Sequence, residues 1–171
     1  MRFDRILRFF VTLTLLGVGL SACTPSGDAV ASTSCNTALA LATYTWQVEY
    51  FTSRGNPQGT RIKEFANTRL LNQNGKKPTD AVTGPDDKGV WWPALPPRPS
   101  ADAMDAERQP GELYEPPRLQ QTVRYTLQCT DGELGTDDAT YRQAARTIRA
   151  GQSVEVNYTL GRVLNLKQAQ P

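Results

Sequence analysis

Prolines and turn-forming residues crowd the middle of this chain, and they restrict the possible folds more than any other feature of the sequence. Residues 72–118 include the run Trp91-Trp92-Pro93-Ala94-Leu95-Pro96-Pro97-Arg98-Pro99 and, later, Pro110-Gly111 and Pro116-Pro117. Because proline lacks a backbone N–H and fixes φ, it is excluded from helix interiors and central strands and favours irregular structure. We therefore predict an irregular, proline-rich insertion over 72–118, of the long kind that is either functional or disordered.

The sequence on both sides of this insertion alternates between apolar and polar residues, as half-buried strands do. Before it, residues 44–51 are predicted to form a strand, and 60–65 its hairpin partner. After it, we expect strands over 119–129, 153–160 and 163–166. The stretch 54–77 carries six bases and one acid, whereas 80–115 carries eight acids and three bases. This segregation of charge predicts that the insertion is held against the first hairpin.

A single amphipathic helix is predicted over 136–150. Thr136 is the expected N-cap, the acids that follow it complement the helix dipole, and Gly151 stops the helix. Apolar residues recur at helical spacing, namely Tyr141, Ala144, Ala145 and Ile148. The predicted fold class is α+β: a small antiparallel sheet or open barrel of four or five strands, one helix in the C-terminal half, and the long insertion.

The first 22 residues have the features of an export signal. Three arginines precede a short apolar run over 9–20, which is too short for a membrane span of about 20 residues. The sequence Leu20-Ser21-Ala22-Cys23 then resembles the lipobox of bacterial lipoproteins. The resemblance implies cleavage between Ala22 and Cys23 and a lipid, such as palmitate, on Cys23. The alternative is a conventional secretory signal with a small-residue cleavage site.

The resemblance also implies a location and a domain organisation. The signal peptide occupies 1–22, the lipidated Cys23 and a flexible tether occupy 23–34, and a single domain occupies 35–171. In lipoproteins an Asp after the cysteine tends to retain the protein in the inner membrane, so Thr24 favours the outer membrane. We expect an exported protein anchored to a bacterial membrane through its lipid and facing the periplasm.

Charge and cysteine content narrow the function. The leader removes three arginines and one aspartate, which leaves sixteen charges of each sign in the mature chain. A nucleic-acid partner is therefore not expected, because such proteins keep a basic excess. Cys35 and Cys129 remain as an even pair in an oxidising compartment, and we predict a structural disulfide between them. Two free thiols, or a redox pair, are the alternatives.

The sequence contains no recognisable catalytic motif. The chain contains no histidine, so histidine-dependent triads and zinc sites are excluded, and no phosphate-binding glycine motif occurs. The adjacent acids Asp86-Asp87 and Asp137-Asp138 are far more often solvated than catalytic. We expect a protein that is not an enzyme and binds neither a metal nor a cofactor.

Two groups of residues are candidates for contact with a partner. Trp91 and Trp92 either pack over the sheet or form a recognition surface on a stiff loop, and the recognition surface is the hypothesis to test. The prolines after them also have the form of a PxxP ligand, or are simply stiff. Arg142, Arg146 and Arg149 either complement the helix C-terminus and pair with Asp138, or contact anionic headgroups.

The last third of the chain carries a second resemblance. The segment Gly151-Gln152-Ser153-Val154-Glu155-Val156-Asn157-Tyr158-Thr159 is similar to uncharacterised small β-rich domains of bacterial membrane-associated proteins, with Leu160 where they have proline. That resemblance implies no activity. We therefore expect a lipid-anchored envelope protein that acts as a binding or structural module, with an envelope protein or a glycan as partner. The alternatives are a carboxylate enzyme acting on envelope glycans and a carrier with a pocket between sheet and helix.

The lipid on Cys23 is directly testable. Replacing Cys23 by Ala removes the atom that accepts the lipid, so the variant should accumulate as an unprocessed precursor without acyl chains. Intact-mass measurement of the membrane-bound protein checks this. Maturation and fractionation of the Cys23→Ala protein like the wild type would contradict the lipoprotein interpretation.

Overall fold

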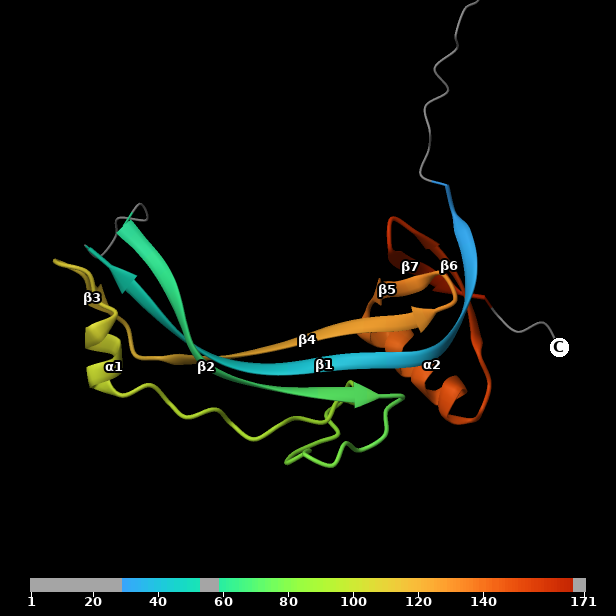
Figure 1. The fold of residues 1–171 in the computed structure, drawn as a ribbon, viewed down its shortest axis with the longest axis horizontal. Helices are drawn as coiled ribbons and strands as arrows, with labels where there is room; N and C mark the ends of the chain where they lie inside the picture. Colours follow the sequence, from blue (N-terminus) through green and yellow to red (C-terminus); the bar gives the residue numbers. More distant parts are fainter. Residues whose placement is uncertain (1–28, 53–58, 168–171) are drawn as a thin grey trace, which may run out of the picture.

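One long strand, β1 (Ala31–Phe51), runs the length of the molecule and pairs with four other strands (Figure 1). The computed structural model describes residues 29–52 and 59–167, so the expected leader, its cleavage site and Cys23 lie outside the described residues. The first residues of β1 pair with β6 (Val154–Thr159), and most of the strand lies between β4 (Arg118–Cys129) and β2 (Thr60–Gln73). Its last residues pair with β3 (Leu113–Tyr114). β1 is therefore the strand on which the sheet is built.

One end of the molecule, which we call the head, is a ring of strands with a helix against it. The pairing runs from β1 to β4, then to β5 (Gly132–Thr136), β7 (Arg162–Leu166) and β6, and returns to β1. Only one residue pair, Gly135↔Arg162, joins β5 to β7, so the ring is barely closed on that side. The helix α2 (Asp138–Arg149) connects β5 to β6 and packs against β1.

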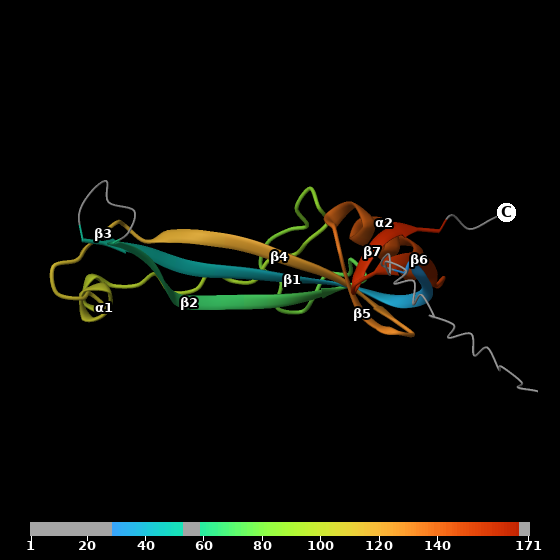
Figure 2. The same cartoon turned by 90° about the horizontal axis from the view of Figure 1, so that it is seen from above.

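The rest of the sheet extends from the head as an arm of three strands, β2, β1 and β4 (Figure 2). At its far end lie β3 and a short helix, α1 (Ala101–Ala106), which begins at an N-cap formed by Ser100. A small core holds this end together, with Val48 and Tyr50 of β1 packed against Met104 of α1. The Tyr50 hydroxyl donates a hydrogen bond to the Met104 carbonyl, at 2.8 Å.

The main core lies under α2 and under the first part of the insertion. Alternate residues of β1, Ala38, Ala40 and Ala42, are fully buried in it. Their methyl groups leave room for other elements to approach the strand closely, and α2 contributes Tyr141 while the insertion contributes Val90. Small side chains on one face of β1 thus allow the helix and the insertion to share a single core.

The insertion lies along the same face of the sheet and is fixed there by polar side chains. Asn72 of β2 is fully buried; its Oδ1 accepts a hydrogen bond from the Trp91 N–H at 2.7 Å, and its Nδ2 donates to the Trp91 carbonyl at 3.0 Å. Further on, Thr68 donates to the Ala94 carbonyl and the Trp46 indole donates to the Pro96 carbonyl, at 2.6 and 2.9 Å. Prolines accept such bonds without needing to donate, so this stretch is ordered although it is irregular.

Ion pairs fix the far part of the insertion to the arm, as the segregated charges predict. Arg61 of β2 makes a bidentate contact with Glu112 at 2.8 and 2.9 Å, and this hydrogen bonding lowers the pKa of the Glu112 carboxyl. Lys63 pairs with Glu107 at 2.9 Å. Bidentate arginine–carboxylate contacts are geometrically specific, so they hold the insertion in one position along β2.

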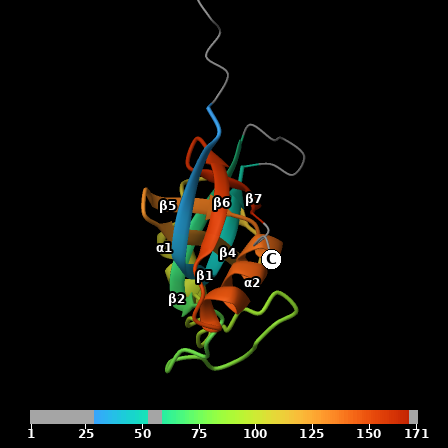
Figure 3. The ribbon, with the colours of Figure 1, turned by 90° about the vertical axis from the view of Figure 1, so that its right-hand side faces the viewer.

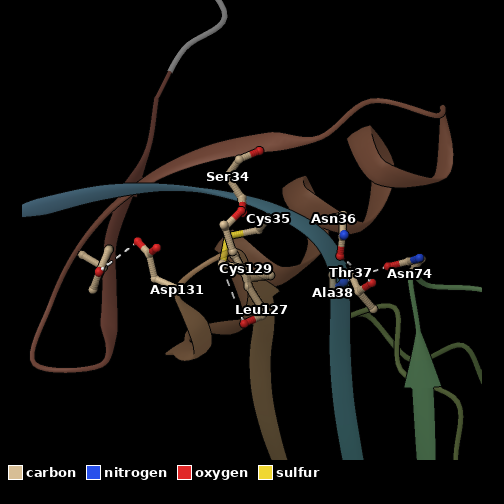
Figure 4. The surroundings of a disulfide bond; sticks show 11 residues. Ser34, Cys35, Asn36, Thr37, Ala38, Asn74, Leu127, Cys129 and Asp131 are labelled. Atoms are coloured by element: carbon tan, nitrogen blue, oxygen red, sulfur yellow. Dashed lines mark hydrogen bonds between the residues drawn. A yellow bond between two sulfur atoms is a disulfide. The ribbon is translucent and has the colours of Figure 1, made fainter.

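The predicted disulfide is present (Figure 4). Cys35 and Cys129 face each other across β1 and β4 and close a loop between positions 94 residues apart. The bond lies where β1 leaves β4 and begins to pair with β6, because Cys35 is paired with Cys129 on one side and with Val154 on the other. It therefore joins the arm and the head at their junction.

Several details of the prediction are wrong. The sheet has seven strands instead of four or five, because β3 and β5 pair within it as additional short strands. β1 also begins earlier than expected, at Ala31. The expected tether therefore ends before Ala31, since residues 31–34 pair with β6. The insertion contains α1 and β3, because the proline-free stretch between Pro99 and Pro110 is free to form a helix. The N-cap of α2 is Asp137 instead of Thr136.

The anchoring role of Asn72 gives a stability prediction. Replacing Asn72 by Ala leaves the buried N–H and carbonyl of Trp91 without their partner, at a cost of about 1–3 kcal/mol for each unsatisfied group. We expect urea unfolding to show a loss of about 2–4 kcal/mol. The control is Asn67→Ala, on the exposed side of the same strand, which should change stability by less than about 0.5 kcal/mol. Equal stability of the two variants would contradict the anchoring role.

Candidate anion-binding cleft between helix α2 and the insertion

A cleft of about 230 Å³ lies where α2 meets the insertion and the turn after β2. Nine residues from these three segments line it: Asn74, Gly75, Pro85, Gly89, Tyr141, Arg142, Ala145, Arg146 and Arg149. It is the meeting point of segments that are far apart in the sequence. Its geometry therefore depends on the packing of the insertion described above.

The turn after β2 forms one wall and is fixed against β1. Asn74 and Gly75 both have left-handed backbone conformations, with φ of 53° and 65°. Asn74 makes a reciprocal contact with Ala38: its side-chain Oδ1 accepts from the Ala38 N–H at 2.7 Å, and its own N–H donates to the Ala38 carbonyl at 2.8 Å (Figure 4). Asparagine and glycine are the residues that adopt this conformation at least cost, so the Asn-Gly pair sets the wall.

A tight loop of the insertion forms the second wall. Asp86 closes it, because its Oδ1 accepts from the backbone N–H groups of Lys88 and Val90 at 3.0 and 2.8 Å. Its Oδ2 accepts from the Trp92 indole N–H at 3.0 Å. Gly89, with φ of 78°, lies at the bend. Asp86, a candidate acid in the sequence, is thus engaged in holding the loop.

The third wall is α2, which presents three arginines to the cleft. Arg142 donates to the Asp87 carbonyl at 3.1 Å, and Arg149 donates to the Gly75 carbonyl at 3.5 Å. Within the described part of the chain, none of the three arginines forms an ion pair with a carboxylate, and the predicted Asp138–Arg142 pair is not formed. The helix dipole explains Arg146 and Arg149, which lie in the last turn, but Arg142 lies nearer the start.

Tyr141 lines the cleft and is almost completely buried, with 1% of its surface exposed. Its hydroxyl makes no hydrogen bond of ordinary geometry to any described residue. Burial raises the pKa of this hydroxyl, and the nearby Gly75 N–H offsets only part of the rise. The phenol therefore stays protonated at neutral pH.

A second tyrosine, Tyr125, lies beside Tyr141. The ring of Tyr125 from β4 lies 5.2 Å from that of Tyr141, and its buried hydroxyl also has no partner among residues 29–52 and 59–167. Burial, with a smaller effect from the nearby Asp86, raises the pKa of Tyr125 to about 12. Both phenols are therefore neutral, and neither compensates the positive charge of the arginines.

These groups suit the binding of an anion. Guanidinium groups match the geometry of carboxylates and phosphates. The described ranges hold no cluster of three or more acidic or cysteine side chains that is arranged to bind a metal. Asp137, the other candidate acid, accepts from the Thr140 N–H at 2.7 Å as a helix cap. The cleft thus offers donors and positive charge, and the acids near it have structural roles.

Trp92, a candidate for partner contact in the sequence, is half-buried in the structure. Its ring lies 4.8 Å from that of Tyr44 and packs against the main core. Trp91 is half-buried, with the Lys77 ammonium 5.3 Å from its ring. Trp92 packs against the core that contains the small alanines of β1, and this helps to fix the wall of the cleft.

The sequence indicated the three arginines as candidates for binding, but it did not indicate the other residues that line the cleft. Tyr141 was assigned to the core by its helical spacing, which is correct for its ring and uninformative about its hydroxyl. Asn74-Gly75 carries a recognisable turn signal. No local pattern indicates that this turn meets α2, because the contact arises from the tertiary structure.

Comparisons with protein-family models, curated proteins and solved structures find no match for this chain. Among the helices of residues 29–52 and 59–167, none has the length and apolar character needed to cross a bilayer.

Proposed function

We propose that this protein is a lipid-anchored binding module of the bacterial cell envelope, and that its cleft binds an anionic group of an envelope glycan or protein. One observation carries the proposal. Three arginines of α2 line the cleft, and none of them forms an ion pair with a carboxylate of the described residues. An oxyanion in the cleft supplies the countercharge for these arginines.

The charge balance of the chain supports a localised anion site. The mature sequence has equal numbers of acidic and basic residues, so the chain as a whole exerts no general attraction on anions. A positive cluster in a neutral domain instead concentrates the potential at one place. Such a protein discriminates a small anionic group from the extended charge of a nucleic acid, which is bound through a broad basic surface.

The order of the strands in the head also supports a binding role. The ring β1-β4-β5-β7-β6, with a helix between β5 and β6 and a parallel contact between β5 and β7, follows the connections of the OB-fold. Proteins of that fold bind oligonucleotides and oligosaccharides on a partly open barrel. A fold does not define a function, so this analogy ranks below the chemistry of the cleft.

The residues and the volume of the cleft support a binding role better than the role of an enzyme or of a small-ligand carrier. None of the nine residues that line the cleft is an acid, and the carboxylate of Asp86, in the loop that forms one wall, accepts three hydrogen bonds. Its volume of about 230 Å³ lies below the roughly 300–1,000 Å³ of pockets that enclose a whole small molecule. It suits one anionic group at the surface of a larger partner.

The test is calorimetric titration of the purified lipidated protein in detergent with muramyl dipeptide, which carries one free carboxylate, and with neutral triacetylchitotriose. We expect binding of the first that weakens as salt is added. The triple variant Arg142→Gln/Arg146→Gln/Arg149→Gln should bind at least tenfold more weakly, a loss of about 1.4 kcal/mol or more.

The matched control is Arg69→Gln/Arg118→Gln/Arg124→Gln, which removes the same charge from exposed positions of β2 and β4. It should change the dissociation constant less than about twofold. Equal losses in both triples would show that net charge alone matters, and an unchanged constant in the first triple would remove the cleft as the site. Failure of the wild type to bind the carboxylate of muramyl dipeptide would contradict the proposed ligand class.

A further inference from the structure

The turn between β6 and β7 contains a leucine at an unfavourable position. Its apolar side chain is exposed to water, and its backbone has a conformation that leucine rarely adopts. Leu160 is 79% exposed and has a φ of +46°, and it is followed by Gly161 with a φ of +73°. The two residues link the paired positions Thr159 and Arg162, so they form a two-residue hairpin turn. Asparagine, aspartate and glycine are preferred where both turn residues have positive φ, because a side chain is crowded there. Leucine therefore needs an explanation other than the turn.

A second exposed apolar residue lies beside this turn. Val30 is 62% exposed and directly precedes Ala31, which pairs with Tyr158. Continuing that antiparallel register by one residue places Val30 opposite Thr159, next to Leu160. Figure 1 shows the start of β1 and the β6–β7 turn at the same end of the head. We call Val30, Leu160 and Gly161 the apolar tip.

A basic residue flanks the apolar tip. Arg162 follows the turn directly, is exposed, and makes no ion pair within the described part of the chain. Apolar side chains beside a free cation are the combination that binds at the surface of a bilayer, where the apolar groups enter the acyl boundary and the cation meets anionic phosphates.

The position of the tip in the sequence points to the same surface. Val30 comes seven residues after Cys23, and an extended chain covers at most about 3.5 Å per residue. The lipid on Cys23, on which this inference rests, therefore keeps the tip within about 25 Å of the acyl chains. We infer that the apolar tip inserts into the bilayer that holds this lipid, with Leu160 and Val30 in the headgroup region and Arg162 at the phosphates.

This docking fixes which side of the molecule faces the membrane. Seen end-on, the β6–β7 turn and the start of β1 lie at one side, and α2 and the insertion lie at the other (Figure 3). With the tip in the bilayer, the cleft faces away from the membrane. The arginines are then open to a partner in the envelope and do not lie on lipid headgroups.

A fluorescent label on the tip tests the inference. Cys35 and Cys129 are joined in the disulfide, and an acylated Cys23 is blocked, so the engineered thiol of Leu160→Cys is the reactive one. The lipidated protein, labelled with a nitrobenzoxadiazole and reconstituted in phosphatidylglycerol-containing vesicles, is exposed to iodide in the water and to nitroxides on the acyl chains. The matched control is Leu95→Cys, another exposed leucine (62%), which lies on the insertion.

We expect the label at position 160 to be quenched at least threefold more by acyl-chain nitroxides than the label at 95, and to be protected from iodide. Equal iodide quenching at the two positions would overturn the inference. Protection at 160 from both quenchers would also overturn it, because a protein would then cover the tip.

The mass of the N-terminal peptide separates this result from the proposed anchoring. If Cys23 carries acyl chains but the label at 160 is exposed to water, the lipid anchor is confirmed and the insertion of the tip into the bilayer is refuted. A Cys23 without acyl chains would refute the anchoring. Because Cys23 would then be a second reactive thiol, a Cys23→Ala/Leu160→Cys protein is labelled and mixed with the vesicles, and the same quenching ratio decides whether the tip inserts.

Discussion

Everything distinctive in this structure depends on how closely other elements approach one face of β1. The alternate residues Ala38, Ala40 and Ala42 give that face the smallest side chains a strand can carry while still being apolar. Larger residues there would hold α2 and the insertion away from the sheet. With alanines, both elements reach the same core, and the insertion passes close enough to β2 for Asn72 to bind its backbone on both sides of Trp91.

The cleft follows from this packing. α2 supplies the cations and the phenol, the turn after β2 supplies one wall, and the loop closed by Asp86 supplies the other. No single segment contains a site, which agrees with the absence of any catalytic or binding motif in the sequence. The insertion therefore acts as a structural wall, and the aromatic residues within it are used to fix its position.

Local chemistry made part of this predictable. The alternation of apolar and polar residues predicted strands, and Gly151 predicted the end of α2. The segregation of charge predicted contacts such as the ion pairs of Arg61 and Lys63, and the even number of remaining cysteines predicted the disulfide. The rest is non-local. The strand at 31–34 has small polar residues that resemble a tether, and it is a strand only because β6 pairs with it. The residues that surround the arginines of α2 could not be predicted either, because only the tertiary structure brings them together.

Hydrogen exchange at the insertion tests the central claim most directly. The amides of Trp91 and Trp92 donate to the Asn72 side chain and to the Thr83 carbonyl, at 2.7 and 2.9 Å. If the insertion is part of the folded core, both should exchange at least about 100-fold more slowly than in an unstructured chain, near the rate of Ala40 in β1. Exchange of these two amides at the unstructured rate, with Ala40 protected, would show that the insertion is a free loop and that the cleft it forms does not exist.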